Sequence, residues 1–181
     1  MATEPHEYHA EAVLRNGETL VIRAIHPDDK DRLHEHFLSL GRESVYNRFL
    51  GSKVDLTPEE LRQLTELDFD RHVGLFAVRR RKGREEVLGV ARYVVIDGSD
   101  PRRAEMAVAV SDASQNLGVG TVLLEHLARI AVERGVQVFE ADVLGVNNRM
   151  MRMIRRSGLP MDLSRNGGVL HVSLRVPEER R

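Results

Sequence analysis

The chain has 181 residues, which is enough for one domain with a substantial core. Its 27 basic and 28 acidic residues give a net charge of -1, which excludes a nucleic-acid partner held by bulk positive charge. Because the chain has no cysteine, disulfides, thiolate nucleophiles and cysteine-based metal sites are also excluded. No apolar run approaches the roughly 20 residues of a membrane helix, so we expect a cytoplasmic protein without a membrane partner.

The N-terminal segment shows no pattern of regular structure. Residues 1–15 are mostly polar, and the turn signal Asn16-Gly17 follows them. We therefore expect a flexible leader over residues 1–15 and a single domain over residues 16–181. The first element of that domain is a strand, because residues 18–25 alternate in polarity and are rich in β-branched side chains.

Three helices are predicted next. Pro27-Asp28-Asp29 places acidic residues in the first turn of one helix, and residues 42–50 form a second, short one. Thr57, Pro58 and Glu60 predict the start of a third helix, with Thr57 as the N-cap and Glu60 completing a capping box.

The middle of the chain is rich in strand patterns. Residues 72–80 and 86–96 are two β-rich runs, and the basic stretch 81–84 between them is typical of a hairpin tip. A loop at 97–101 leads to a third strand at 104–111. These three strands predict an antiparallel meander.

The last part of the chain alternates helices and strands. A glycine-bearing loop opens an amphipathic helix that ends at Arg134-Gly135. A strand over 137–144, a basic helix over 147–157 and a strand over 169–176 follow. After its first strand, the chain thus continues with helices and then with a meander, and it ends with alternating helices and strands. This order predicts an α/β fold with a mixed sheet and not a regular βαβ repeat.

Residues 115–121 are the segment that most clearly indicates chemistry, because a strand leads there through a glycine-bearing loop into a helix. A helix N-terminus has free backbone N–H groups and the positive end of the helix dipole. Gly118 and Gly120 let the backbone approach an anion closely, so the loop is a plausible pyrophosphate cradle. It has neither the Lys-Ser/Thr ending of a nucleotide P-loop nor the G-x-G-x-x-G of a dinucleotide site. The alternative is that the glycines serve tight packing alone.

The segment Gln115-x-x-Gly118-x-Gly120 resembles the Q/R-x-x-G-x-G/A signature of the GNAT acetyltransferases. A second block, from Asn147 to Gly158, and the order of the elements resemble the same family, over residues 18–176. The resemblance implies the GNAT fold, a mixed central sheet flanked by helices in which two parallel strands splay apart. It also implies that the cosubstrate is acetyl-CoA and that the acetyl group passes to a primary amine.

Two further stretches are similar to the bacterial protein-lysine acetyltransferases of this family. Residues 44–50, SVYNRFL, are similar to that group's S-R-Y-x-R-F segment, and residues 104–108 read AEMAV. A protein lysine is therefore the expected acceptor, and a small-molecule amine is the alternative. Two hypotheses without catalysis stay open, an acyl-CoA-binding sensor and an interaction module that has lost the cofactor. A homodimer is compatible with the sequence.

The resemblance also implies roles for individual residues. Backbone amides of residues 117–121 would hold the pyrophosphate of acetyl-CoA. The backbone of residues 108–110 would pair with the pantetheine arm, and one of its N–H groups would stabilise the oxyanion. Asn147 would contact the pantetheine or the sulfur. The residues expected at the cofactor are Val108, Ala109, Val110, Gln115, Asn116, Leu117, Gly118, Val119, Gly120, Thr121, Asn147 and Met150.

Glu105 is the expected general base. An amine with a pKa near ~10.4 is protonated at neutral pH and must lose a proton before it attacks the thioester. Glu105 is the one charged residue of the predicted strand 104–111 and stands where many protein-acetylating members of the family keep a base. The alternative is an exposed carboxylate, or one paired with Arg102 or Arg103.

The resemblance places Tyr46 and Arg48 on the acceptor side, whereas packing of Tyr46 and Phe49 onto the sheet is the alternative. Two positions depart from the family pattern. Leu117 stands where a basic residue is common, and Ile154 stands where many members carry a tyrosine general acid. Basic residues of the predicted helix 147–157 could compensate for the missing basic residue at position 117; they are Arg149, Arg152 and Arg155.

The eight histidines do not predict a metal site. His34 and His36 are two residues apart and point to different sides of a helix, so they cannot chelate together. The other histidines are scattered along the chain.

Overall fold

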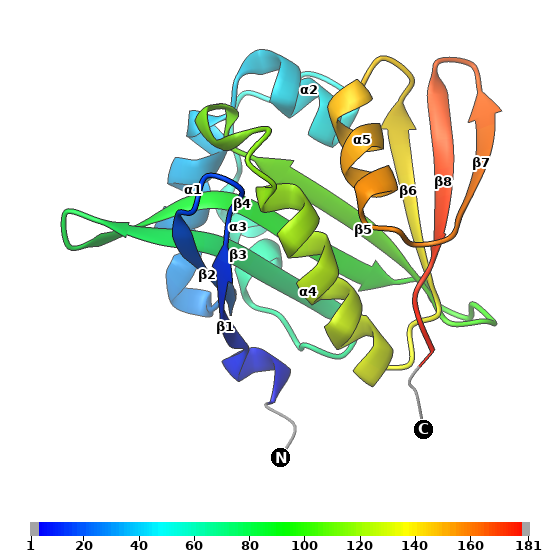
Figure 1. Cartoon of the computed structure of the whole chain (residues 1–181), viewed down its shortest axis with the longest axis horizontal. Helices are drawn as coiled ribbons and strands as arrows, with labels where there is room; N and C mark the ends of the chain where they lie inside the picture. The colour runs from blue at the N-terminus through cyan, green and yellow to red at the C-terminus, as the bar shows by residue number, and fades with distance from the viewer. Residues whose placement is uncertain (1–3, 179–181) are drawn as a thin grey trace.

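A mixed eight-stranded sheet with helices on both faces forms the protein, in a computed structural model that describes residues 4–178 (Figure 1). The strands lie in the order β1-β2-β3-β4-β5-β6-β8-β7. Their bounds are β1 His9–Val13, β2 Thr19–Ala24, β3 His72–Arg81, β4 Arg84–Val95, β5 Arg103–Val110, β6 Val138–Leu144, β7 Met161–Asn166 and β8 Val169–Arg175. The helices are α1 Lys30–Ser39, α2 Arg42–Phe49, α3 Pro58–Thr65, α4 Val119–Glu133 and α5 Asn148–Arg156, with 3-10 turns η1 Pro5–Glu7, η2 Pro27–Asp29 and η3 Asp112–Ser114.

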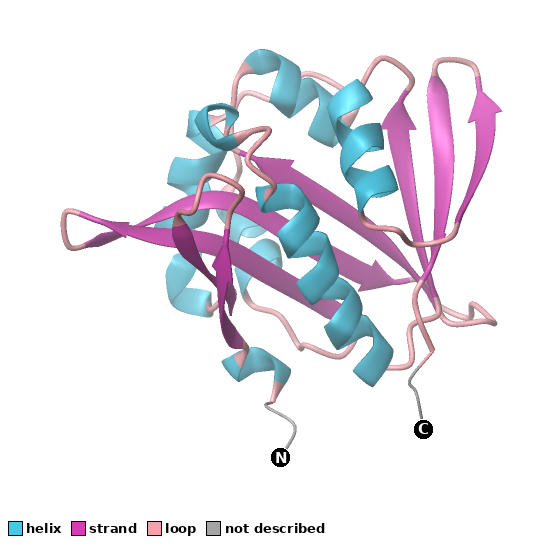
Figure 2. Ribbon diagram, in the orientation of Figure 1, coloured by secondary structure: helices cyan, strands magenta, loops and turns pink. Residues whose placement is uncertain are grey.

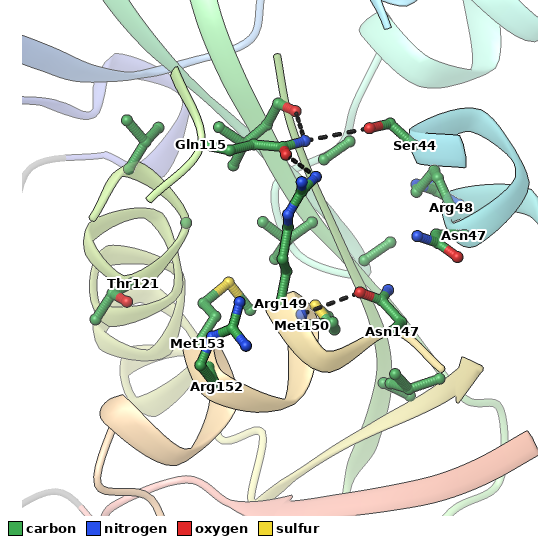
Figure 3. Close-up of a pocket in the computed structure, with 18 of the residues that line it drawn as sticks. Ser44, Asn47, Arg48, Gln115, Thr121, Asn147, Arg149, Met150, Arg152 and Met153 are labelled. Carbon is green, nitrogen blue, oxygen red and sulfur yellow. Dashed lines mark hydrogen bonds between the residues drawn. The ribbon is translucent and has the colours of Figure 1, made fainter. Parts of the chain in front are cut away.

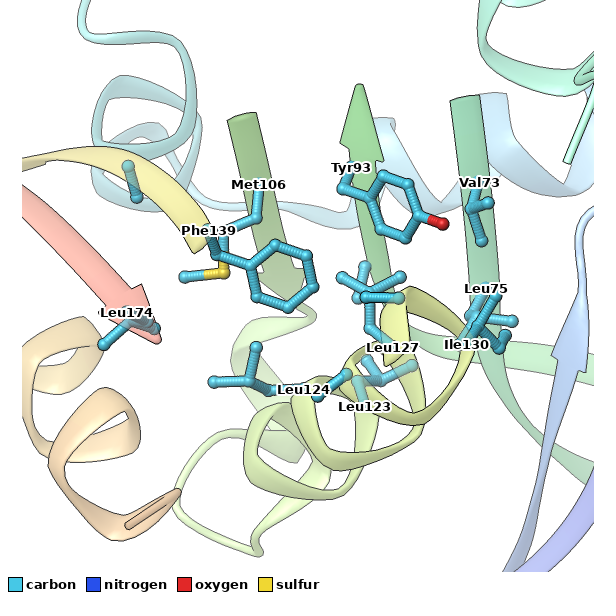
Figure 4. Packing of buried hydrophobic residues seen from close by; sticks show 14 of the residues in the cluster. Val73, Leu75, Tyr93, Met106, Leu123, Leu124, Leu127, Ile130, Phe139 and Leu174 are labelled. Carbon is cyan, nitrogen blue, oxygen red and sulfur yellow. The ribbon is translucent and has the colours of Figure 1, made fainter. Parts of the chain in front are cut away.

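Two layers of helices enclose the sheet (Figure 2). Helix α4 lies along one face, where its apolar stripe of Leu123, Leu124, Leu127 and Ile130 packs against the sheet in the larger core (Figure 4). Helices α1, α2 and α3 cover the opposite face through a smaller apolar cluster. Because successive strand residues point to opposite faces, β4 and β5 present different side chains to the two helix layers.

The two parallel strands of the sheet, β5 and β6, separate soon after they meet. They pair only where Arg103–Glu105 lies beside Val138–Glu140. Beyond Glu105, β5 stays with β4 while β6 stays with β8, so the strands diverge. Figure 1 shows the resulting opening, with α5 beside it. The predicted α/β fold with splayed parallel strands is confirmed.

The predicted helices and the meander are confirmed with small differences in their bounds. Thr57 and Glu60 form the expected reciprocal capping box at the start of α3. Within the part of the chain that the structure describes, no helix is both long and apolar enough to cross a membrane.

Within the segment expected to be a flexible leader, the structure contains a 3-10 turn and a paired strand, which the sequence analysis did not predict; residues 1–3 lie outside the described residues. Strand β1 pairs with β2 in antiparallel register, His9 opposite Arg23. Its alternate residues are half-buried, and a bond between the Tyr8 hydroxyl and His126 Nδ1 of α4, 2.5 Å long, ties the segment down. Strand β7 was also missed, because it is a polar and mostly exposed edge strand held by its hairpin with β8.

Candidate active site

A cavity of about 370 Å³ lies where β5 and β6 diverge (Figure 3). It is bounded by β5, by the N-terminus of α4, by α5 and by α2. Of the residues expected at the cofactor, eleven line it; these are Val108, Ala109, Val110, Gln115, Asn116, Gly118, Val119, Gly120, Thr121, Asn147 and Met150. Leu117 does not, because its side chain packs against the larger core.

The two glycines of the loop are explained by different physical requirements. Gly118 is the N-cap of α4 and has φ +93°, a left-handed conformation that side chains disfavour. A Cβ at Gly120 would fall 2.6 Å from Sδ of Met153, so this glycine allows α4 and α5 to approach closely. Tight packing, the alternative weighed from the sequence, therefore accounts for Gly120 only. No side chain caps the N-terminus of α4, which leaves its first backbone N–H groups for an anion.

Basic side chains of α5 line the same cavity. Arg149 and Arg152 were expected there, and Arg156 takes the place that Arg155 was given. The spacing of the sequence already predicts that one face of this helix is basic, because a helix brings to one face positions 149, 152, 153 and 156. Arg15 is a residue that the sequence did not suggest; its Nε lies 3.7 Å from the position of a Cβ on Gly118. These arginines provide positive charge where Leu117 provides none.

Side-chain hydrogen bonds connect the loop before α4 to helix α2. The Gln115 amide donates from Nε2 to Ser44 Oγ over 3.1 Å and to the Val110 carbonyl over 3.2 Å (Figure 3). The carboxylate of Asp112 accepts from the Ser44 hydroxyl, 2.7 Å, and from the backbone N–H of Gly41, 3.1 Å. Arg149 donates to the Gln115 carbonyl oxygen. The loop, α2 and α5 are therefore held in one network.

Asn147 has a structural role as well as a place in the cavity. Its side-chain oxygen accepts a hydrogen bond from the N–H of Met150, 3.1 Å, and so caps α5. Since the oxygen is engaged in the cap, the amide nitrogen is the group left to face a ligand. Met150 lies at the edge of the core and also lines the cavity.

Glu105 is an exposed residue of β5 that lines this cavity and a second one of about 550 Å³. Of the alternative weighed from the sequence, the exposure of Glu105 is what the structure has, whereas a pairing with Arg102 or Arg103 is not. Arg103 pairs with Glu140, and Arg102 lies 3.4 Å from a carboxylate oxygen of Asp70. Glu105 thus stands at the junction of the two cavities with its carboxylate outside those ion pairs.

The two residues expected on the acceptor side lie on different sides of α2. Arg48 lines both cavities, and its charge interacts with that of Glu105. Burial lowers the pKa of Arg48, and Glu105 partly offsets this. Tyr46 is exposed and lies outside both cavities, while Phe49 packs edge-on against Phe37.

Ile154 is fully buried in the larger core, so the position to which the resemblance assigned a tyrosine general acid contributes no such group to the cavity. Within residues 4–178, no group of three or more histidine and carboxylate side chains is arranged to hold a metal ion.

Residues 42–159 match the family model described as the acetyltransferase (GNAT) family. The chain is 29% identical over 140 residues to an acetyltransferase of Pseudomonas aeruginosa, covering 77% of this chain and 73% of that protein. It is 31% identical over 145 residues to the acetyltransferase Pat of Mycolicibacterium smegmatis, covering 80% of this chain and 42% of Pat. Among solved structures, the GNAT domain of S. lividans PAT has a TM-score of 0.83 and 35% identity, over 92% of this chain and 96% of that domain.

Proposed function

Since this chain belongs to the GNAT family of acetyltransferases, we propose that it transfers the acetyl group of acetyl-CoA to the side-chain amine of a protein lysine. The observation that carries the proposal is the cavity between the diverging strands. One end has the uncapped N-terminus of α4 and the arginines of α5, and the other end has Glu105. The cavity therefore has an anion-binding group at one end and a carboxylate at the other.

Acetyl-CoA fits this distribution of charge along the cavity. Its pyrophosphate is placed at the backbone N–H groups from Gly118 to Thr121, with Arg149 and Arg152 beside it. Its pantetheine arm is placed along β5 from Val108 to Val110, on the side where β6 has moved away. Backbone groups there have lost a neighbouring strand and can pair with amide groups of the ligand.

Glu105 is placed as the general base. It accepts a proton from the ammonium group of the acceptor, directly or through water, which leaves a neutral amine. The nitrogen attacks the thioester carbon, and a backbone N–H of β5 stabilises the oxyanion of the tetrahedral intermediate. The nitrogen, which carries an extra proton after the attack, releases that proton to water. The C–S bond then breaks, so that an amide forms and CoA leaves as a thiolate. With Ile154 in the core, no tyrosine protonates that thiolate, and a thiol pKa near ~8.5 makes an unassisted departure reasonable.

A protein lysine is preferred as the acceptor because residues 44–50 resemble the protein-lysine acetyltransferases and because Arg48 of that segment lies beside Glu105. A small-molecule amine is the alternative acceptor within the same chemistry. A binding protein without catalysis would bind acetyl-CoA but would not use Glu105.

The test compares the wild type with Glu105→Gln and with Glu125→Gln, an exposed carboxylate on α4 that serves as the control. Millimolar acetyl-CoA should raise the melting temperature of all three proteins by several degrees, since a ligand at 100 times its Kd adds about 2.7 kcal/mol. Acetylation of lysine-containing peptides should be lost in Glu105→Gln alone. Equal activity of the three proteins would remove Glu105 from the mechanism, and no thermal shift in any of them would remove acetyl-CoA.

A further inference from the structure

The second cavity lies between the sheet and helices α2 and α3, meets the first cavity at Glu105 and Arg48, and contains two arginines. Arg92, in the middle of β4, is 6% exposed and pairs with Gly74 on one side and Ala107 on the other. Glu105 is two residues along β5 from Ala107, on the same face, so its Cα lies roughly 7–8 Å from that of Arg92. Arg48 enters the same cavity from α2.

Within the part of the chain that the structure describes, neither guanidinium forms a hydrogen bond or a close ion pair with a carboxylate, although the charge of Glu105 acts on Arg48 over a longer distance. No carboxylate hydrogen bond supports the charge of Arg92, and burial together with the charge of Arg48 lowers its pKa to about 9. Arg23 shows the contrast. It is also buried, at 8% exposure, but it bonds to both oxygens of Asp29 and to Glu85. A buried charge is normally paired in this way, because an unpaired one is costly.

A third polar group faces the cavity without a partner. Nε2 of His72 is buried and makes no hydrogen bond with any described residue. Burial and the nearby charge of Arg92 lower the pKa of His72 to about 4, so the ring is neutral at pH 7 and can donate one N–H. The other carboxylate on the cavity wall, Glu66, lies 3.3 Å from Nζ of Lys30. The cavity therefore offers two cations and one neutral donor to a ligand, close to the base.

We propose that this cavity binds a carboxylate carried by the acceptor, a few bonds away from the amine that is acetylated. The inference rests on the proposed acetyl transfer, since it is the position of Glu105 that places the amine. Arg92 and Arg48 bind the carboxylate, and His72 adds a hydrogen bond. Two sources share this chemistry, a lysine beside an acidic residue in a protein and a free amino acid.

Matched acceptors test the inference. A lysine peptide with a neighbouring glutamate is compared with the same peptide carrying glutamine, and free lysine is compared with lysinamide. The wild type should acetylate the carboxylate member of a pair about tenfold or more faster at low concentration, chiefly through a lower KM, because a desolvated arginine–carboxylate pair strengthens binding by at least this factor. Preference within the peptide pair alone identifies an acidic protein segment, and preference within the free pair alone identifies an amino acid.

The variants are Arg92→Met, Arg92→Lys and the control Arg62→Met, whose side chain is exposed on α3. Arg92→Met should lose the preference while still acetylating the neutral acceptors, Arg92→Lys should keep part of it, and Arg62→Met should keep all of it. Equal loss on charged and neutral acceptors in Arg92→Met would indicate a structural role and overturn the proposal. So would a wild type with no preference in either pair.

A binding measurement separates this inference from the proposed function. At matched ionic strength, sodium glutarate should raise the melting temperature of the wild type more than neutral glutaramide does, and Arg92→Met should abolish that difference. If glutarate binds and no amine is acetylated, the anion site stands and the acetyl transfer fails. If amines are acetylated without regard to charge and glutarate has no effect, the acetyl transfer stands and the anion site fails.

Discussion

Replacing Arg92 and Arg23 by methionine should change the stability of the protein in opposite directions. Both arginines are buried on the same face of the sheet, at 6% and 8% exposure, and methionine has a similar length. They differ in their partners. Arg23 bonds to Asp29 and Glu85, whereas the charge of Arg92 has only the repulsion of Arg48 near it.

The magnitudes follow from these surroundings. Removing Arg23 leaves Asp29, 2% exposed, without its main partner, which should cost about 3–5 kcal/mol. For Arg92, burial and the charge of Arg48 lower the pKa to about 9. At ~1.4 kcal/mol for each tenfold change, the fall from the ordinary pKa of an arginine sets an upper limit of roughly 5 kcal/mol on the penalty for its charge. Water in the cavity reduces the penalty, so we expect Arg92→Met to gain about 1–3 kcal/mol.

Thermal and urea unfolding of the ligand-free proteins at pH 7 and low salt would measure both changes. A gain of 1 kcal/mol corresponds to a rise of about 2–4 °C in Tm for a chain of this length. The reasoning would be refuted if Arg92→Met lowered the Tm as much as Arg23→Met does, because Arg92 would then be engaged in the fold. If Arg92→Met were more stable than the wild type and also lost the preference for carboxylate-bearing acceptors, the wild type would sacrifice stability in order to bind its acceptor.

Two further predictions concern the cofactor loop and a polar cluster on β6 and β8. Gly118→Ala places a side chain at φ +93°, which should lower the free energy of unfolding by about 1–2 kcal/mol and weaken the stabilisation by acetyl-CoA; an unchanged Tm with and without acetyl-CoA would contradict this. The hydrogen bond that His171 donates to Asp142 raises the pKa of His171; desolvation opposes this shift and Glu140 assists it. The protonated His171 ring therefore makes its full contribution to the free energy of unfolding below about pH 6.5. That contribution is lost as the pH rises through the raised pKa. Urea unfolding from pH 5 to 9 should show that loss in the wild type but not in His171→Gln.

The sequence predicted the elements whose signals are local. The capping box at Thr57 and Glu60 sets the start of α3 by itself, and the β-rich runs of β3 and β4 are continuously buried in the middle of the sheet. Strands β1 and β7 were missed for the opposite reason. They are short, polar edge strands whose hydrogen bonds come from a neighbouring strand, so their own residues carry little signal.

The family and the residues of the cofactor loop were predicted from a motif, and the structure brings all of those residues except Leu117 to one cavity. The acceptor side was less predictable. Tyr46 and Arg48 are two residues apart on a helix, so they point in different directions, and which one faces the cavities depends on how α2 packs. Arg92 did carry a signal, as a charged residue inside an apolar strand, but its missing partner could be recognised only once α2, β3 and β5 were in place.

The network that joins Gln115, Asp112 and Ser44 should make the binding of the two proposed ligands thermodynamically dependent on each other. A cosubstrate that fixes the loop before α4 also fixes α2, since Ser44 bonds to both Asp112 and Gln115, and α2 carries Arg48 into the acceptor cavity. Acetyl-CoA should then raise the affinity for the acceptor, and reciprocity requires the acceptor to raise the affinity for acetyl-CoA by the same factor. Ser44→Ala removes the bonds to Asp112 and Gln115 and should weaken this mutual influence, while the bond from the Gly41 N–H to Asp112 still joins the loop to α2.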